Sequence, residues 1–248
     1  MERIILVTRG NRRAIENYTA KSLACSASYP ASPFWLALLS PSERLLCRIS
    51  SAFKFDPRVQ RACLSRQRQS SCEDFGEHLF IQTSLLEPSR KNLFIQRDIK
   101  IILSREYLIT LHKSRTPLYC SLSGSQVAEL THTGALLLAL FENSTAKLIR
   151  SFCSARNIAV LPVQKCEQPT RNPLWWRLRN FRGALLRDAR LLHGIAAAGD
   201  RFFCPDDKSF FESIRAKIYL LSDVTNRLLL RMDPQAEVPL KRAHQKIS

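Results

Sequence analysis

The feature that most constrains the fold of this chain is the segment 208–232, near its C-terminal end. Apolar side chains and one threonine recur there at steps of three and four, the spacing of a heptad seam on one helix face. The seam consists of Phe211, Ile214, Ile218, Leu221, Thr225, Leu228 and Met232. Asp206 and Asp207 precede it, where carboxylates suit the free N–H groups of a helix, and Pro234 follows it, where a helix ends. The sequence therefore predicts one long amphipathic helix.

Two interpretations of the seam follow from this pattern. In the first, the apolar stripe packs on the core of its own domain. In the second, it forms a stalk that pairs with helices of other chains. Three or more clean heptads with complementary flanking charges would decide for the stalk, so the pattern leaves both interpretations open.

The length of the chain limits how many domains it can form, and its net charge indicates which classes of partner it attracts. The chain has 248 residues and 45% hydrophobic content, enough for one large domain with a helical appendage. Its formal net charge is +17, which attracts anions, nucleic acid or an anionic membrane surface. The basic residues are scattered along the chain, which does not favour a single evolved patch.

Cysteine usage and hydropathy indicate a reducing compartment and no membrane crossing. The first ten residues hold only the short apolar run 4–7, so we expect no secretory signal and therefore free, mostly buried thiols. The eight cysteines include no CxxC pair, so we expect no zinc site. The longest apolar run, 134–141, is far shorter than the roughly 20 residues that cross a bilayer.

The order of elements predicts an α/β domain followed by helices only. We expect strands at 2–8, 34–39, 78–86, 93–96, 99–103 and 107–111, and a polar loop over 66–77. Helices are expected from Ser40 as N-cap, from Asp56, over 130–152 and from Pro173. The segment 157–163 is β-branched but lies between helical stretches. The predicted divisions are an α/β domain over 1–165, a helical stalk region over 166–232 and a disordered tail over 233–248.

Enzyme signatures are absent from the sequence. It contains no GxGxxG, GxxxxGK[ST], HExxH, GxSxG or HxE…PCxxC pattern. The five histidines are far apart, and the acidic pairs 73–74 and 206–207 fit helix caps or solvated residues better than a catalytic dyad. We therefore predict a non-enzymatic protein with no catalytic residues.

Five segments, in order and with the right spacing, resemble the cytoplasmic part of CorA-type magnesium channels. They match the family's tryptophan strand with Pro-x-Glu, its Phe…His-Pro helix junction, its Arg-rich segment before a Phe-Ile strand, its paired strands ending Ile-Thr-x-His, and its helix leading into the stalk. The segments are 34–43, 53–57, 66–81, 101–112 and 179–223. The similarity covers roughly residues 34 to 232.

The resemblance implies an α/β/α cytoplasmic domain with a mixed sheet and a long C-terminal stalk helix. It also implies a homopentamer whose stalk continues into a pore-lining membrane helix that ends in Gly-Met-Asn and passes Mg²⁺ or Co²⁺. Carboxylates between neighbouring cytoplasmic domains bind Mg²⁺ in such channels and hold them closed.

The sequence departs from that family at its end and at its sensor positions. It stops where the stalk should enter the membrane, and it lacks both membrane helices and Gly-Met-Asn, so we expect a truncated cytoplasmic domain that does not conduct alone. With the missing helices it would lie at the cytoplasmic face of the cell membrane. The acidic sensor positions align with Ala62 and Ser213, which offer no carboxylate to Mg²⁺. We therefore predict no metal-ligating residue, and Mg²⁺ enters only through the resemblance.

The alternative hypothesis is a stand-alone basic module that binds nucleic acid or an anionic surface. It rests on the net charge and on the arginines of the helix at 174–192. No helix-turn-helix, RNA-recognition or KH signature supports it. Under the leading hypothesis the partners are copies of the same chain, in an oligomer that is weak without a membrane anchor.

Overall fold

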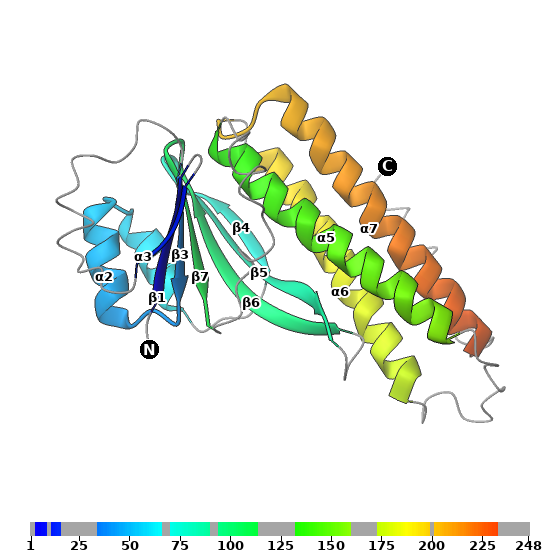
Figure 1. The fold of residues 1–248 in the computed structure, drawn as a ribbon. Helices are drawn as coiled ribbons and strands as arrows, with labels where there is room; N and C mark the ends of the chain where they lie inside the picture. Colours follow the sequence, from blue (N-terminus) through cyan, green and yellow to red (C-terminus); the bar gives the residue numbers. More distant parts are fainter. Residues whose placement is uncertain are drawn as a thin grey trace.

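The computed structural model describes residues 3–8, 11–15, 34–65, 70–89, 94–113, 132–159, 173–198 and 201–232. They form three layers (Figure 1). Helices α2 (Glu43–Ala52) and α3 (Pro57–Leu64) cover one face of a mixed sheet. Three long helices, α5 (Thr133–Ala159), α6 (Pro173–Ala198) and α7 (Pro205–Met232), cover the other face. The expected α/β/α architecture with a long C-terminal helix is confirmed.

The sheet has seven strands in the order β2-β1-β3-β7-β6-β5-β4. They are β1 (Arg3–Thr8), β2 (Asn11–Ile15), β3 (Phe34–Leu39), β4 (Ser71–Asp74), β5 (Leu79–Pro88), β6 (Phe94–Leu103) and β7 (Tyr107–His112). The central pair β3 and β7 is parallel, and the other neighbours are antiparallel. The central strands are buried on both faces, because alternate side chains point to opposite helical layers.

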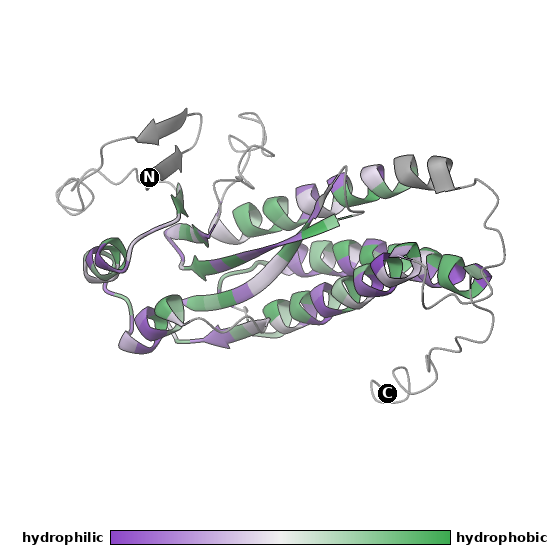
Figure 2. Cartoon of the chain, turned by 90° about the horizontal axis from the view of Figure 1, so that it is seen from below, coloured by the Kyte–Doolittle hydropathy of each residue, from purple (hydrophilic) through white to green (hydrophobic). Residues whose placement is uncertain are grey.

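Two apolar cores result. Trp35 of β3 and its neighbours on the same face pack on α5, α6 and α7. Phe34 and Leu36, which point the other way, pack on Leu45 of α2 and Val59 of α3. Figure 2 shows apolar and polar residues alternating around the helices of the bundle, as expected of helices buried on one side.

Strand pairing overrides local composition in the β5–β6 region. The sequence predicted two short strands at 93–96 and 99–103, but β6 is continuous because it pairs with β5 from Phe94 opposite Pro88 to Leu103 opposite Leu79. Arg97 and Asp98, which lie between the two expected strands, find polar partners on β5. Arg97 pairs with Glu87 at 3.3 Å, and Asp98 accepts a hydrogen bond from the Ser84 hydroxyl at 2.6 Å.

The prediction of a loop over residues 66–77 was wrong in part. Its residues 71–74 form β4, whose polar side chains are tolerated because the strand lies at the edge of the sheet and pairs only with β5.

Helix boundaries differ from the sequence expectations in two places. The N-cap of α2 is Ser42, whose hydroxyl accepts from the Leu45 N–H, and not Ser40. Ser40 has a φ of 48° and donates its N–H to the His112 carbonyl, so it ties β3 to β7. Helix α5 continues to Ala159 and so includes the start of the β-branched segment 157–163. The N-cap role of Asp56 at α3 is confirmed.

Some predictions fall outside the described residues. These include the tail 233–248, the boundary at 165/166, residues 66–69 of the predicted loop and residues 160–163 of the β-branched segment. The division of the chain therefore stays a prediction. Among the helices that the structure describes, none combines the length and the apolar character needed to cross a bilayer.

Candidate functional site

The heptad seam of α7 faces the interior of its own chain. Phe211, Ile214, Ile218, Leu221, Thr225 and Met232 are buried, and Leu228 is half-buried. Helix α7 contacts α5 and α6, and the apolar seam residues belong to the core that those helices share with the sheet. The packing is that of the first interpretation, on the domain's own core. The role of the seam in joining copies stays a prediction, and the apolar side chain that α7 exposes most is instead Leu220, at 67%.

The two positions aligned with acidic sensors lie on separate helices. Ala62 is half-buried in α3, and Ser213 is exposed on α7. The Ala62 carbonyl accepts a hydrogen bond from Nζ of Lys100 at 2.8 Å, and the same ammonium also reaches the carbonyls of Cys63 and Ser65. Lys100 is buried, which lowers its pKa. Its ammonium satisfies the C-terminal carbonyls of α3, and this positive charge would repel a metal cation from the same carbonyls.

Two buried histidines have structural partners. His78 Nε2 lies 2.7 Å from the Tyr107 hydroxyl, and burial lowers the pKa of His78. His112 Nε2 lies 3.0 Å from the Thr110 hydroxyl, which also accepts from the Trp35 indole. Burial lowers the pKa of His112 to about 4, so its neutral form belongs to the core. Both histidines act in packing.

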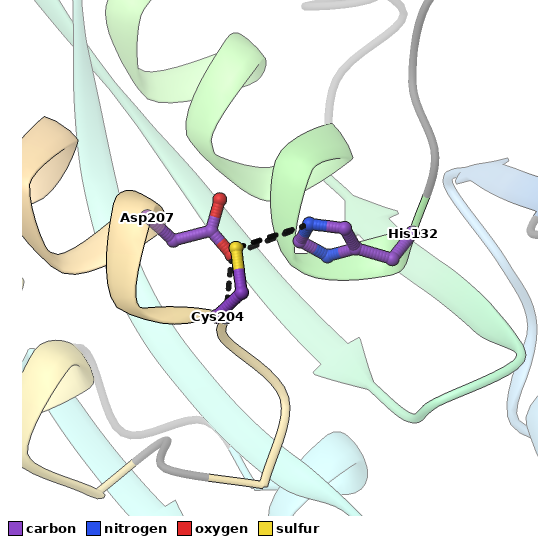
Figure 3. Close-up of side chains that lie close together, drawn as sticks. All are labelled: His132, Cys204 and Asp207. Atoms are coloured by element: carbon purple, nitrogen blue, oxygen red, sulfur yellow. Dashed lines mark hydrogen bonds and ion pairs between the residues drawn. The ribbon is translucent and has the colours of Figure 1, made fainter.

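A third histidine belongs to a cluster that the sequence did not predict. His132, Cys204 and Asp207 come together where α5 and α7 begin, with their ligand atoms within 4.8 Å of one another (Figure 3). His132 is the residue before α5, Cys204 is the residue before α7, and Asp207 lies in the first turn of α7. The cluster therefore joins the N-terminal ends of two helices.

Helix-capping hydrogen bonds hold two of these side chains, those of His132 and Asp207. His132 Nδ1 accepts from the Ala135 N–H at 3.2 Å, as an N-cap residue does. Asp207 Oδ2 accepts from the Cys204 N–H at 2.9 Å, so the carboxylate reaches back over the start of α7. Between the caps, His132 Nε2 lies 3.4 Å from Asp207 Oδ2 and 3.8 Å from Cys204 Sγ.

Gly134 permits this close approach. A Cβ at residue 134 would lie 2.5 Å from the Phe202 carbonyl oxygen and 2.7 Å from Cδ1 of Phe203. The first turn of α5 therefore packs directly on the backbone of the turn that precedes α7. Any larger residue would push the two helix starts apart.

The cluster is open to solvent on one side. Cys204 is exposed, the His132 side chain is 32% exposed, and the Asp207 side chain is 10% exposed. A thiolate, an imidazole and a carboxylate are the ligand types that transition-metal ions use. The cluster therefore brings three donor types that such ions bind within reach of one another.

Sequence reasoning missed this cluster because its residues are distant along the chain. His132 lies 72 residues before Cys204, and no CxxC pair marks the site. The only local signal was an aspartate three residues after a cysteine. The expectation of mostly buried thiols was also wrong for Cys47, Cys153 and Cys204, which are exposed among the five cysteines described.

Comparison with known proteins identifies the fold. No protein-family model and no curated protein sequence matches the chain. Among solved structures, the soluble domain of CorA from Methanocaldococcus jannaschii is similar with a TM-score of 0.68 and 13% identity, over 92% of this chain and 94% of that domain. The complete structure of that magnesium transporter is similar with a TM-score of 0.64 and 12% identity, over 98% of this chain and 78% of that one.

Two further proteins share this architecture. The ZntB cytoplasmic domain from Vibrio parahaemolyticus is similar with a TM-score of 0.69 and 10% identity, over 98% of both chains. The full-length CmaX protein is similar with a TM-score of 0.74 and 11% identity, over 99% of this chain and 78% of that one. At these identities the comparisons show that the chain has a CorA-like fold.

Proposed function

We propose that this chain works as the cytoplasmic domain of a CorA-like divalent-cation transporter and has no enzymatic activity. The observation that carries the proposal is the mutual coverage with the CorA soluble domain, 92% of this chain and 94% of that domain. Because a fold hosts many functions, the ordered resemblance of five sequence segments is the second support. Together they favour transport of Mg²⁺ or Co²⁺ over an unrelated use of the fold.

In this proposal α7 is the mechanical link between the sheet domain and the membrane. It is 28 residues long, about 42 Å at 1.5 Å per residue. Its inner face is fixed on α5 and α6, so a movement at its far end is transmitted to the bundle as a whole. In this proposal the pore is made by membrane helices that are not among these 248 residues, and the domain alone does not conduct.

Control by Mg²⁺ at the family's sensor positions is not part of the proposal. Ala62 and Ser213 supply no carboxylate, and Lys100 places a positive charge on the Ala62 carbonyl. We therefore expect the domain to assemble at the cytoplasmic face of the membrane and to support transport there. Mg²⁺ bound at the sensor positions would not close the channel in the way that the resemblance implies for CorA-type channels.

A chimera tests the transport proposal directly. Residues 1–232 replace the cytoplasmic domain of the M. jannaschii CorA, upstream of its membrane helices, in bacteria that lack magnesium uptake. We expect growth at low Mg²⁺ and no loss of Mg²⁺ uptake when internal Mg²⁺ rises. The control chimera carries Leu221→Pro, which breaks α7 in mid-helix.

Two results of the growth assay would contradict the proposal. A chimera that inserts in the membrane and assembles like the parent transporter, but does not support growth, contradicts the proposal. A chimera with Leu221→Pro that supports growth as well as the intact one contradicts the role of α7.

Binding of nucleic acid is the second candidate, because of the net charge of +17 and the exposed arginines of α6. They are Arg177, Arg179, Arg187 and Arg190. This candidate requires affinity that falls steeply as salt rises, through counterion release. Absence of binding to DNA and RNA at low salt removes it.

A further inference from the structure

We propose that His132, Cys204 and Asp207 form a binding site for a divalent ion of the zinc and cobalt class, which fastens the start of α5 to the start of α7. The proposal rests on side-chain geometry within one chain. It therefore holds whether or not the chain serves transport.

Two of the three donor–donor distances in the cluster match the edges of a tetrahedral site, and the third is within 4.8 Å. With Zn–N and Zn–O bonds of about 2.0–2.1 Å and a Zn–S bond of about 2.3 Å, a tetrahedral ion keeps N and O about 3.3 Å apart and N and S about 3.6 Å apart. His132 Nε2 lies 3.4 Å from Asp207 Oδ2 and 3.8 Å from Cys204 Sγ. The three donors therefore need only small movements to share one ion.

The donor set selects the class of ion. Mg²⁺ and Ca²⁺ take oxygen ligands, and a site with one carboxylate, one imidazole and one thiolate suits them poorly. Zn²⁺ and Co²⁺ accept all three donor types. Because Cys204 is exposed, the fourth position is open to water.

Binding exchanges a helix-cap hydrogen bond for a metal–ligand bond. In the ion-free cluster the Ala135 N–H donates to Nδ1 of His132, so the proton of the neutral ring is on Nε2, facing Asp207. An ion on Nε2 requires that proton to move to Nδ1, and the Ala135 hydrogen bond opens. Cys204 loses its thiol proton to solvent, and one proton is released per ion.

The carboxylate does not have to leave its own cap. Asp207 Oδ2 accepts from the Cys204 N–H, and the other carboxylate oxygen and the remaining lone pairs stay available to the ion. The bound ion thus holds α7 to α5 through His132 while the cap of α7 stays intact. Binding of the ion is expected to stabilise the packing of the two helix starts.

Cobalt absorption of the reduced full chain tests the site. We expect one Co²⁺ per chain, with a near-ultraviolet thiolate-to-Co²⁺ charge-transfer band and the intense visible bands of tetrahedral Co²⁺. Zn²⁺ should abolish the signal, and Mg²⁺ in large excess should leave it unchanged. Zn²⁺ at 100 times its Kd should also raise Tm by about 5 °C or more.

Substitutions locate the ion. Cys204→Ser should remove the charge-transfer band and weaken binding at least about tenfold. His132→Asn keeps an N-cap acceptor for α5 but removes the imidazole, and it should weaken binding to a similar extent. Cys47→Ser and Cys153→Ser, at exposed thiols on α2 and α5, should leave both band and affinity unchanged.

Two results overturn the proposal. The first is a wild-type chain, folded by circular dichroism, that gives no charge-transfer band with Co²⁺. The second is a band that survives Cys204→Ser, because another thiol then holds the ion. Neither result bears on the chimera's transport, so failure of this site and failure of the proposed function are distinguishable.

Discussion

Two titratable side chains, the half-buried Asp188 and the buried His112, give the fold opposite responses to pH. Asp188 lies on α6 among Leu85, Phe141 and Ile218, beside a cavity of about 20 Å³, and burial raises its pKa to about 7. The pKa of His112 is lowered to about 4. The folded state therefore holds the Asp188 proton more tightly than the unfolded state does, and the His112 proton less tightly.

The direction of each pKa shift determines how the free energy of unfolding changes with pH. The stabilisation from Asp188 is fully present below its unfolded pKa of 3.8 and is lost as pH rises towards 7. The stabilisation from neutral His112 is fully present above its unfolded pKa of 6.5 and is lost as pH falls towards 4. Over this interval the two contributions partly cancel.

Replacement of Asp188 tests whether its contribution to stability offsets that of His112. Asp188→Asn removes a charge from an apolar site, so we expect a free energy of unfolding higher by about 1–3 kcal/mol at pH 8 and little change at pH 4. The variant should gain stability between pH 4 and pH 6.5, because the Asp188 contribution no longer offsets those of His112 and His78, whose pKa values burial lowers. Urea unfolding across this range measures both effects.

The matched control for that experiment is Asp223→Asn, which removes an exposed carboxylate paired with Arg227 one turn along α7. Its effect should stay below about 0.5 kcal/mol at every pH. An Asp188→Asn variant that is less stable than wild type at pH 8 would contradict the unfavourable burial of this charge.

At the scale of elements, α5 and α7 meet backbone to backbone at their starts. The Thr133 hydroxyl donates to the Ser104 carbonyl, so the same helix start is also fixed to the β6–β7 turn. Gly134 packs on the Phe202 carbonyl, and His132 and Asp207 close the contact. This one contact joins α5, α7 and the sheet.

Gly134→Ala tests that contact. Alanine favours a helix by about 0.8–1.0 kcal/mol over glycine, but the added Cβ collides with backbone that has little room to move. We therefore expect net destabilisation of about 1–3 kcal/mol and weaker Co²⁺ binding at the cluster. Chemical denaturation and the cobalt titration measure the two effects.

Gly194→Ala provides the control, because a Cβ at that position of α6 meets no atom within 4 Å. The same substitution there should stabilise the chain by about 0.5–1 kcal/mol. Equal effects at the two glycines would contradict a tight contact at the start of α5.

At the scale of the whole molecule, the bundle uses its apolar seam internally and leaves only scattered apolar side chains outside. On α7 these are Tyr219, Leu220 and Leu230. Contact between copies of the chain would therefore be made by the outer face of α7, with limited apolar area. We expect weak, concentration-dependent self-association in the absence of membrane helices.

Sedimentation velocity over a range of concentrations measures this association. Leu220→Asp should shift the chain towards monomer, because it places a charge in the contact, and Ser51→Asp on the exposed side of α2 should have no effect. A chain that stays strictly monomeric at high concentration would contradict a contact through α7.

Much of the fold was predictable because its determinants are local. The three-and-four spacing from Phe211 to Met232 sets the apolar face of α7 wherever the helix lies. Pro57 and Asp56 set the start of α3 by restricting φ and by accepting a backbone N–H. The alternation of strands and helices before residue 165 indicates the α/β class for the same reason, since each pattern acts within a few residues.

Only the tertiary structure decided where those patterns face and what they bring together. Strand β4 exists although its residues are polar, and β6 runs unbroken through Arg97 and Asp98, because β5 pairs with both strands. The seam is covered by α5 and α6, whose positions depend on contacts between residues far apart in the sequence. The cluster of His132, Cys204 and Asp207 forms because two helix starts pack across Gly134, and no pattern within either segment encodes that approach.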